Sequence, residues 1–436
     1  MKSTICVVGS GAREHALALT LAKSCEKVIV TPGNPGMTAN LDARDGSPAT
    51  EFGTIDITDL PPEAIEASLY VIGPEVPLVE GLADKLRSLG KKVVGPGADG
   101  AKLEGSKIWM KEILTKSGVP TAKFGVFDEF ERARRYLKEM KGPWVIKTDG
   151  LAAGKGVLVT DSLAHAIDDV RSKLSGESFG AAGTKVVIEE YMEGLELSLM
   201  VLTDGKTLAP MSPARDAKRV FDGDEGANTG GMGAFSPVPL QSGESIDKLV
   251  DDAMERAVEP LLGRLIKDGI DYRGVLYAGL MLTEEGPKVV EYNIRFGDPE
   301  TQAVLPRLEG DLVSLLDQVA TGHLSTEPRF SPKRCVNVVL SAPGYPESPK
   351  LGEPIEINRE KVGKSQVFFA GVTQREDGAL LTSGGRVMSV SALGDNLIEA
   401  RENAYRSIEG IEFEGMHFRR DIGLMAVELE STNESA

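Results

Sequence analysis

The chain has 436 residues, a formal net charge of −17, 49 glycines and 3 cysteines. This length predicts two to four domains with sizeable buried cores. The acidic balance argues against a nucleic-acid or anionic-membrane surface, because phosphate groups select basic faces. The isolated cysteines predict a reducing, cytoplasmic environment without disulfides or a cysteine metal site. No signal-peptide pattern and no 18-residue apolar run is present.

The first hundred residues alternate short apolar runs with helical patterns. The predicted elements are strands at 5–8, 28–30, 69–72 and 92–94 and helices at 14–23 and 78–89. Continuous apolar strands separated by helices indicate a parallel sheet that is covered on both faces. A Gly-Pro-Gly turn at 95–97 is a plausible boundary for this α/β region.

The middle of the chain mixes helices with strands that follow one another across turns. The predicted elements are helices at 106–116 and 246–267 and strands at 144–146, 157–159, 186–188, 196–203, 274–282 and 288–292. This pattern indicates an α+β domain with antiparallel strands. The last hundred residues predict strands at 336–340, 367–369 and 387–390, a helix at 396–408 and a frayed polar tail from residue 428.

The first glycine cluster, Gly9 to His15, follows a strand and opens a helix. Free N–H groups at a helix N-terminus attract anions, so this turn predicts a phosphate site that Arg13 would strengthen. A purely structural turn is the alternative. A dinucleotide fingerprint would need glycine at position 14, where the chain has glutamate. The loops at 33–36 and 73–75 follow other strands of the same sheet and lie at the same edge.

The second cluster runs from Lys147 to Gly156 and resembles a P-loop without being one. Only three residues separate Gly150 from Gly154, and the segment after Lys155 is a strand. A glycine-rich lid over phosphate oxygens is a better explanation than an ordinary hairpin. Lys147 ends an apolar strand, where a lysine rarely lacks a partner.

Two further clusters carry weaker signals. The acidic segment from Glu189 to Glu196 follows a strand, and its backbone could pair with a purine edge, although a solvated strand end is the simpler interpretation. Asp216, Lys218 and Arg219 precede the glycine-rich stretch 222–233. Their charge favours a substrate loop over a linker.

The fifth cluster, at 291–300, contains a candidate metal site. Strand alternation places Glu291, Asn293 and Arg295 on one face. Two oxygen ligands beside a cation suit Mg²⁺, which takes one or two carboxylates and completes its shell with water and phosphate oxygens. A solvated edge strand is the alternative.

The clusters recur in a recognisable order. The segments are GSGAREHA (9–16), GNPG (33–36), GPEVPL (73–78), LEGSK (103–107), VIKTDGLAAGKGV (145–157), EYMEGLELS (190–198), DGDEGANTGGMGAFSP (222–237), EYNIRFGDPE (291–300), GGRV (384–387) and DIG (421–423). Over nearly its whole length, the chain resembles the phosphoribosylamine–glycine ligase family of the ATP-grasp superfamily. Ala12 and Ala227 depart from the residues that the family often has there, glycine and proline.

The resemblance implies a multidomain α/β and α+β protein. A Rossmann-like domain would span 1–104, an ATP-grasp domain 105–325 with a mobile lid at about 123–193, and a small α/β domain 326–436. The implied reaction joins glycine to 5-phosphoribosylamine through a glycyl phosphate, with ATP as co-substrate, and is the second step of de novo purine synthesis. Mg²⁺ or Mn²⁺ is the implied metal, in a cytoplasmic enzyme expected to be a monomer without nucleic-acid or membrane partners.

The resemblance also implies roles for individual residues. It assigns phosphate and ATP contacts to Lys107, Lys147, Gly154, Lys155 and Gly156, adenine and ribose contacts to Glu189, Glu190, Tyr191, Met192 and Glu196, and the metal to Glu291 and Asn293. It assigns phosphoribosylamine to Gly11, Arg13, Asn34, Gly36 and Glu75, the glycine side to Asp216, Lys218 and Arg219, and catalysis to Arg295, Lys155, Asp216 and Lys218.

Three alternatives remain at this point. An NAD(P)-dependent dehydrogenase would need glycine at position 14 and has no use for the later lysines. An inactive nucleotide-binding module would not need Lys147, Glu291, Asn293 and Arg295 together. The nearest competitor is another ATP-grasp ligase that joins a different carboxylate and amine.

Overall fold

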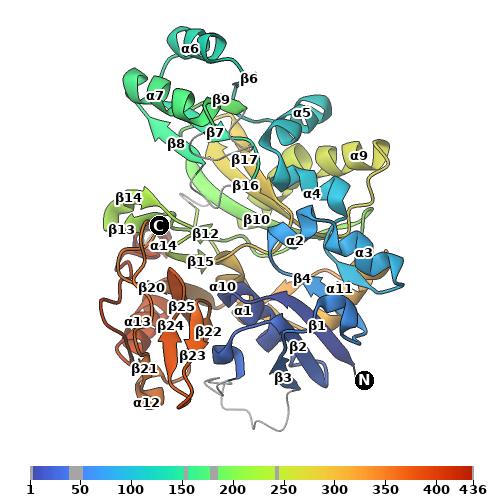
Figure 1. Cartoon of the computed structure of the whole chain (residues 1–436), viewed down its shortest axis with the longest axis vertical. Helices are drawn as coiled ribbons and strands as arrows, with labels where there is room; N and C mark the ends of the chain where they lie inside the picture. Colours follow the sequence, from blue (N-terminus) through green and yellow to red (C-terminus); the bar gives the residue numbers. More distant parts are fainter. Residues whose placement is uncertain (1–2, 39–52, 152–155, 177–184, 241–244, 435–436) are drawn as a thin grey trace.

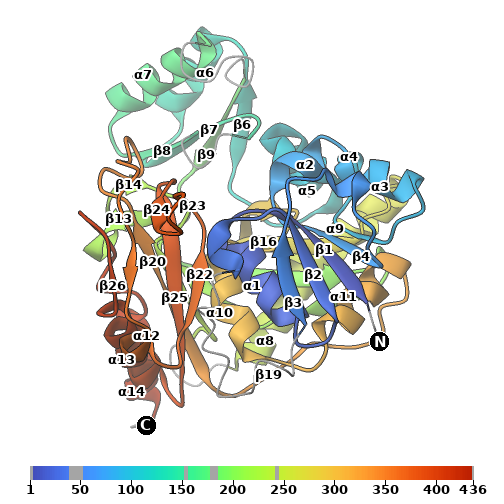
Figure 2. The same cartoon turned by 60° about the horizontal axis from the view of Figure 1, so that its bottom comes forward.

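The computed structural model describes residues 3–38, 53–151, 156–176, 185–240 and 245–434. Figure 1 shows an N-terminal region at the lower right, a C-terminal region at the lower left, and a central region above them. A smaller unit projects at the top of this view, and Figure 2 shows it standing away from the rest of the chain. Among the described residues, no helix is long and apolar enough to cross a membrane.

The N-terminal region is a five-stranded, wholly parallel sheet in the order β3-β2-β1-β4-β5. Its elements are β1 (Thr4–Gly9), α1 (Ala12–Leu21), β2 (Lys27–Pro32), β3 (Thr54–Ile57), β4 (Leu69–Ile72), α2 (Glu75–Val79), α3 (Leu82–Ser88) and β5 (Val93–Val94). All four residues of β4 are buried, as expected of a strand covered on both faces. The predicted parallel α/β region is therefore confirmed.

The predicted helix at 78–89 is wrong in one respect, because the structure divides it into α2 and α3. Gly81 lies between the two helices with φ 85°, a left-handed conformation that glycine adopts at little cost. The chain turns here between the two helices. Helix α2 itself starts shortly after β4 and places Glu75 at the carboxyl edge of the sheet.

The central region contains two antiparallel sheets. One, with order β6-β9-β7-β8, forms the projecting unit, and the other has order β11-β10-β16-β17. The elements are α4 (Ala98–Gly105), α5 (Lys107–Ser117), β6 (Phe124–Phe127), α6 (Phe130–Glu139), β7 (Trp144–Thr148), β8 (Val157–Thr160), α7 (Leu163–Leu174), β9 (Val186–Glu190), β10 (Leu195–Thr203), β11 (Leu208–Pro210), α8 (Ile246–Ala253), α9 (Glu259–Lys267), β16 (Gly274–Thr283) and β17 (Gly286–Asn293).

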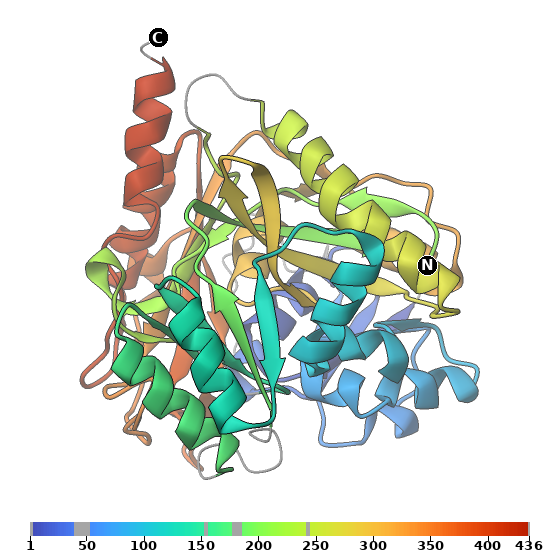
Figure 3. The same ribbon diagram turned by 90° about the horizontal axis from the view of Figure 1, so that it is seen from above.

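Most of the central prediction is confirmed, including the β16–β17 hairpin. Figure 3 shows α8 and α9 as one long rod, and a π-helical turn at Met254–Val258 joins them. The sequence pattern did not reveal α4, because glycines lie at both of its ends and its apolar face is short.

The C-terminal region is built on a five-stranded sheet in the order β12-β15-β20-β25-β22. Its elements are β12 (Arg215–Asp216), β13 (Arg219–Phe221), β14 (Glu225–Asn228), β15 (Gly233–Ser236), β20 (Arg334–Ser341), β21 (Glu356–Ile357), α12 (Arg359–Val362), β22 (Gln366–Phe369), β23 (Val372–Gln374), β24 (Leu380–Thr382), β25 (Arg386–Gly394), α13 (Leu397–Ile408), β26 (Ile411–Glu412) and α14 (Leu424–Glu434). Two of its strands, β12 and β15, therefore come from the stretch that the sequence placed in the middle domain.

The expected frayed tail is also corrected. Residues 424–434 form α14, which runs to the end marked C in Figure 3. Glu430 on this helix accepts hydrogen bonds from Arg334 at 2.7 Å and from the backbone N–H of Leu397 at 2.8 Å. These contacts tie the last helix to β20 and to the start of α13.

Helix α1 lies between the N-terminal sheet and the C-terminal region (Figure 1). His15 on this helix is 1% exposed and packs against the rings of Phe368 and Phe369 in β22. Its Nδ1 atom accepts the backbone N–H of Phe369 at 2.9 Å. Burial lowers the pKa of His15 to about 3, so the ring is neutral in the folded chain.

This neutral histidine predicts an acid-sensitive contact between the two regions. Below pH 6.5 the unfolded chain binds a proton at His15 and the folded chain does not. Proton binding therefore favours the unfolded chain, and the free energy of unfolding decreases as the pH falls toward 3. A His15→Leu variant should unfold at a lower temperature at pH 7.5, and the gap to the native chain should narrow at pH 5. Exposed His323→Leu is the control, and a gap that does not change with pH would contradict the prediction.

Candidate active site

A cavity of about 630 Å³ lies where the three regions and the projecting unit meet, a volume typical of small-molecule sites. Its wall includes many of the residues singled out in the sequence. They are Arg13, Glu75, Lys107, Lys147, Gly156, Asp216, Lys218, Glu291, Asn293 and Arg295. The structure therefore brings together residues that are up to 282 positions apart in the chain.

Lys147 lies at the end of β7, on the side of the cavity formed by the projecting unit. Its ammonium group is 3.1 Å from Glu189 in the neighbouring strand β9, and it donates to the carbonyl of Val290 at 3.1 Å. The sequence indicated that this lysine needs a partner, and antiparallel pairing of β7 with β9 supplies it.

Glu189 also binds Lys111, which sequence reasoning missed. Lys111 is 0% exposed, lies 3.2 Å from Glu189 and donates to the hydroxyl of Thr121 at 2.7 Å. Burial lowers the pKa of Lys111 to about 8, although Glu189 opposes the shift. Its position four residues after Lys107 in a helical pattern places both lysines on one face of α5, which was the available signal.

The N-terminus of α5 is tied to the loop that follows β7. Ser106 caps the helix, and its hydroxyl donates to the carboxylate of Asp149 at 3.0 Å. The backbone N–H of Ile108 donates to the same carboxylate at 3.2 Å, and Lys107 donates to the carbonyl of Gly150 at 3.0 Å. Burial lowers the pKa of Lys107. This loop therefore enters the cavity beside two lysines.

Glu291 and Asn293 project from β17 into the cavity, as strand alternation predicts. The Asn293 amide lies 3.5 Å from Glu291. Burial alone would raise the pKa of Glu291, but Lys218, Lys147 and Lys107 together hold the pKa of this carboxyl below its usual value. An ionised carboxylate and a carbonyl oxygen thus face the same space as three lysines.

Arg295 is held between two carboxylates. Its guanidinium lies 2.8 Å from Glu104 at the end of α4 and 3.3 Å from Glu75 at the start of α2. Burial opposes the charge on Arg295, but Glu104 and Glu75 raise its pKa further above the ordinary value. Glu104 also accepts the backbone N–H of Ile294 at 2.9 Å. The sequence contained no sign of this cluster, because Glu104 lies 191 residues from Arg295.

A second polar cluster surrounds Lys218 and Asp216, whose side chains are 3.1 Å apart. Behind them, buried Glu300 accepts the hydroxyls of Tyr277 at 2.8 Å and Ser198 at 3.0 Å. Burial raises the pKa of Glu300, and Asp216 raises it further. Glu300 and Tyr277 both line the cavity, and neither was a candidate from the sequence.

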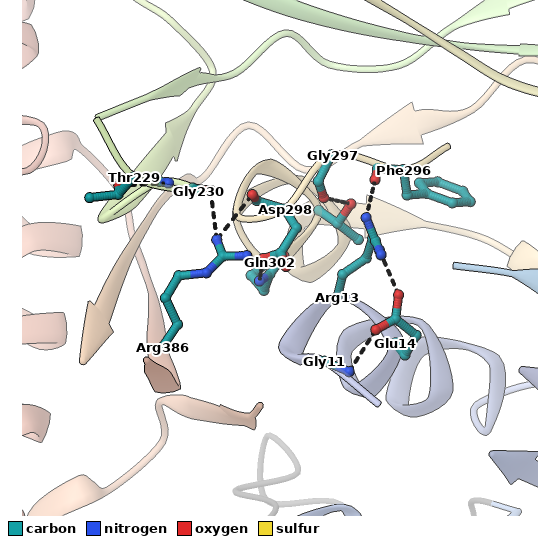
Figure 4. A network of polar contacts seen from close by, with 12 residues as sticks. Gly11, Arg13, Glu14, Thr229, Gly230, Phe296, Gly297, Asp298, Gln302 and Arg386 are labelled. Atoms are coloured by element: carbon teal, nitrogen blue, oxygen red, sulfur yellow. Dashed lines mark hydrogen bonds and ion pairs between the residues drawn. The ribbon is translucent and has the colours of Figure 1, made fainter. Parts of the chain in front are cut away.

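The C-terminal region contributes Arg386 to the cavity wall, and Figure 4 shows the contacts of this side chain. Arg386, at the start of β25, donates to the carboxylate of Asp298 at 2.8 Å and to the carbonyl of Gly230 at 2.7 Å. Asp298 also accepts the Gln302 side-chain amide at 2.7 Å. Arg386 was part of a sequence motif at 384–387 but was not expected in the site.

The turn after β1 is filled by the protein itself. Glu14 accepts the N–H of Gly11 at 2.7 Å and the guanidinium of Arg13 at 2.6 Å (Figure 4). Gly73 leaves the space that this carboxylate occupies, since a Cβ there would lie 2.0 Å from Glu14. The anion site expected at this helix N-terminus is therefore occupied by Glu14, and Arg13 is the cation of this turn that lines the cavity.

Several other predicted residues lie off the cavity wall. Asn34 donates to the carbonyls of Ser10 and Phe369 and accepts the N–H of Gly36, so its side chain joins the N-terminal and C-terminal regions. Arg219 donates to the carbonyl of Gly226 at 2.6 Å within the β13–β14 hairpin.

The predicted adenine and ribose residues form a separate group. Glu190 accepts the backbone N–H of Lys123 at 3.0 Å, while Tyr191 is 44% exposed and Met192 half-buried. Burial raises the pKa of Glu196 on β10, with Asp216 and Glu291 near enough to contribute. Gly154 and Lys155 lie outside the described residues.

Comparison with known proteins assigns this architecture. Family models of the N, ATP-grasp (A) and C domains of phosphoribosylglycinamide synthetase match residues 3–104, 105–301 and 335–425. The phosphoribosylamine–glycine ligase of Caulobacter vibrioides is 45% identical, and that of Escherichia coli 42% identical, each over 98% of this chain and 99% of the relative.

Solved structures agree with this assignment. The phosphoribosylamine–glycine ligase of Thermotoga maritima has a TM-score of 0.83 at 35% identity and covers 96% of this chain and 100% of its own. The biotin carboxylase domain of Hydrogenobacter thermophilus 2-oxoglutarate carboxylase, at 15% identity, has a TM-score of 0.69 over 100% of this chain and 96% of its own, and shares the fold alone.

The two antiparallel central sheets and the cavity beside them, lined by charged side chains of both signs, define an ATP-grasp ligase. Matched along nearly its whole length, the chain belongs to the phosphoribosylglycinamide synthetase family. The family resemblance that the sequence motifs indicated is thereby confirmed.

The shared carboxylate of Glu189 generates a stability prediction. A Glu189→Gln variant removes the carboxylate that lies within ion-pair distance of both Lys111 and Lys147, and removing one partner of a buried pair typically costs about 3–5 kcal/mol. Thermal unfolding should show this loss. Exposed Glu193→Gln in the same segment is the control and should change stability by less than about 0.5 kcal/mol. Equal unfolding temperatures for the two variants would contradict the assigned role.

Proposed function

We propose that this chain joins glycine to 5-phosphoribosylamine at the expense of ATP, the second step of de novo purine synthesis. The observation that carries the proposal is the cavity in which Glu291 and Asn293 face Lys107, Lys147 and Lys218. Full-length similarity to ligases named for this reaction supports it. Fold and charge together suit a reaction that transfers a phosphoryl group and then displaces it.

The reaction runs in two steps. A carboxylate oxygen of glycine attacks the γ-phosphorus of ATP, the bond to the bridging oxygen breaks, and ADP leaves. The amine of phosphoribosylamine then attacks the carbonyl carbon of glycyl phosphate, loses a proton, and expels inorganic phosphate to leave glycinamide ribonucleotide. No covalent bond to the protein is needed, so the side chains act by positioning the reactants and stabilising charge.

The donor set suits Mg²⁺ or Mn²⁺ held by Glu291 and Asn293. Their ionised carboxylate and amide oxygen are hard ligands, and such ions take few protein ligands when phosphates are present. Within the described residues, no cluster of three or more histidine, cysteine, aspartate or glutamate side chains offers an alternative cage. When bound, the metal would neutralise phosphate charge and fix the phosphate oxygens in place.

Cations from different elements would bind the phosphate groups of ATP. Lys107 and Lys147 flank the loop after β7, and we extend this role to Gly156, which lines the cavity, and to Gly154 and Lys155. Glu189 holds Lys147 in place. The backbone of 189–192 would contact adenine and Glu196 the ribose, with the β6–β9 unit, at about 123–193, serving as the lid.

The substrate side of the cavity would use the other charged groups. Arg13 and Glu75 would contact phosphoribosylamine near the loops that contain Gly11, Asn34 and Gly36. Asp216 and Lys218, with Arg219 nearby, would serve glycine, because an ammonium–carboxylate zwitterion matches a paired carboxylate and ammonium group 3.1 Å apart. Arg295 would stabilise negative charge on the transferring phosphoryl group or the tetrahedral intermediate.

Another ATP-grasp ligase with a different carboxylate and amine remains the second candidate, because the same cavity would serve it. We also propose a monomeric enzyme of the cytoplasm. Its three cysteines are all free and buried, which fits a reducing environment.

The metal assignment is tested at Glu291. Glu291→Gln removes a charge but keeps the side chain's shape, so turnover should fall by at least about 100-fold, the cost expected when one charge-stabilising group of a phosphoryl-transfer site is lost. The unfolding temperature should change little, because Glu291 is not within ion-pair distance of Lys107, Lys147 or Lys218 and interacts with them only at longer range. Exposed Glu285→Gln on the same hairpin is the control. Near-normal turnover and metal affinity would remove this metal site.

The reaction itself is tested by phosphate release from ATP. Purified protein is supplied with phosphoribosylamine, generated in the assay because it is labile, and with each amino acid in turn. Release should require both glycine and phosphoribosylamine. Release with another amino acid in place of glycine would favour the second candidate, and release without any amino acid would contradict both.

A further inference from the structure

A second cavity, of about 710 Å³, lies at the opposite end of α1 from the active site. The last turn of α1 provides Leu19 and Ala22, followed by Lys23, and the C-terminal region provides most of the remaining wall. That wall includes residues of α12, β22, β25 and α13. Nothing in the proposed reaction uses this cavity.

Cations outnumber carboxylates on its wall. The positively charged residues are Lys23, Lys333, Lys361, Lys364 and Arg406, and the negatively charged residues are Glu360 and Glu399. Among the described residues, Lys23, Lys361 and Lys364 have no carboxylate within ion-pair distance, whereas Glu399 already accepts the backbone N–H of Asp395 at 2.7 Å. In a chain with net charge −17, such a local surplus attracts anions.

The wall of this cavity combines polar and apolar side chains. Ser365 and Ser407 are each 5% exposed and their hydroxyl oxygens lie 2.7 Å apart. The Ser407 hydroxyl also donates to the carbonyl of Val362 at 2.8 Å, and Val362 and Leu393 line the same cavity. Hydroxyl and ammonium groups of the wall suit a phosphate, while its apolar side chains suit a flat ring or sugar face attached to it.

Three elements run from the active site to this cavity. Helix α1 places Arg13 in the first cavity and Leu19 in the second, and β25 places Arg386 in the first and Leu393 in the second. The third is α10 (Glu300–Val304) with the short helix Leu305–Arg307, which starts at the active site and puts Pro306 in the second cavity. A ligand in the second cavity therefore touches the same rigid elements that carry active-site groups.

We propose that the second cavity is a regulatory site for a phosphorylated small molecule of about the size of a nucleoside monophosphate. Its cations bind the phosphate, and its apolar wall takes the remainder of the ligand. A bound ligand shifts α1 and β25 relative to the N-terminal sheet. Because these elements carry Arg13 and Arg386 of the active site, the shift changes catalysis. This differs from the active site in location, residues and consequence.

Calorimetry with AMP as the probe tests the binding, with the active site first saturated by a non-hydrolysable ATP analogue and Mg²⁺. Titrations compare the native chain, a Lys361→Glu/Lys364→Glu variant and a Lys116→Glu/Lys267→Glu control that has the same change in charge at exposed helix positions elsewhere. AMP should bind one site, and the cavity variant should bind it at least about tenfold more weakly, because two charge-assisted contacts become repulsive.

Several outcomes would overturn the assignment. No binding of AMP to the native chain, or equal loss in both variants, would remove the site. Loss of binding in Arg13→Ala instead of the cavity variant would place AMP in the active site. Adenosine binding as tightly as AMP would remove the role of the phosphate, whereas competition by inorganic phosphate supports it.

The regulatory part is tested by activity. AMP should change kcat or KM of the native chain and of the control by at least about twofold, and leave the cavity variant, whose basal activity is unchanged, unaffected. Binding of AMP in the second cavity without any change in kcat or KM would show that the site is not regulatory. This readout does not depend on which amino acid the enzyme uses, so its failure is distinguishable from failure of the proposed reaction.

Discussion

The ion cluster of Arg295 with Glu104 and Glu75 is the contact on which the active site depends. Three segments that are distant in sequence meet there: the end of α4, the start of α2 and the turn after β17. A buried guanidinium without these carboxylates would face a large desolvation cost. With them, the N-terminal sheet is fixed against the strand that carries Glu291, so the two sides of the cavity keep one geometry.

The same pairing of charges explains how a strongly acidic protein can bind anionic substrates. Most cations of the cavity have a carboxylate within ion-pair distance, as Lys147 has Glu189 and Arg386 has Asp298. The carboxylates keep the cations charged in a site of low dielectric constant, and the cations keep Glu291 ionised. Substrate phosphates then bind among charged groups that are already in position. Such preorganised charges can stabilise the charge that develops during phosphoryl transfer.

Local sequence patterns predicted what depends on neighbouring residues. The parallel sheet, the β16–β17 hairpin and the shared face of Glu291 and Asn293 follow from apolar periodicity and strand alternation. Patterns could not show which distant groups meet. Nothing in the sequence near Arg386 indicates that this side chain reaches Asp298, 88 residues away. The loop of Asn34 has the right position for a ligand, but the Asn34 amide donates a hydrogen bond to the carbonyl of Phe369. Partners of that kind are set by packing between regions.

Glycyl phosphate is the intermediate of the proposed reaction, and transfer of ¹⁸O tests it directly. Glycine labelled with ¹⁸O in both carboxylate oxygens is converted with ATP and phosphoribosylamine, and the inorganic phosphate is analysed by mass spectrometry or ³¹P NMR. We expect one ¹⁸O atom per phosphate released, because the oxygen that attacks the γ-phosphorus leaves with it, and one ¹⁸O retained in the amide product. Unlabelled phosphate, or label found in a nucleotide, would contradict it.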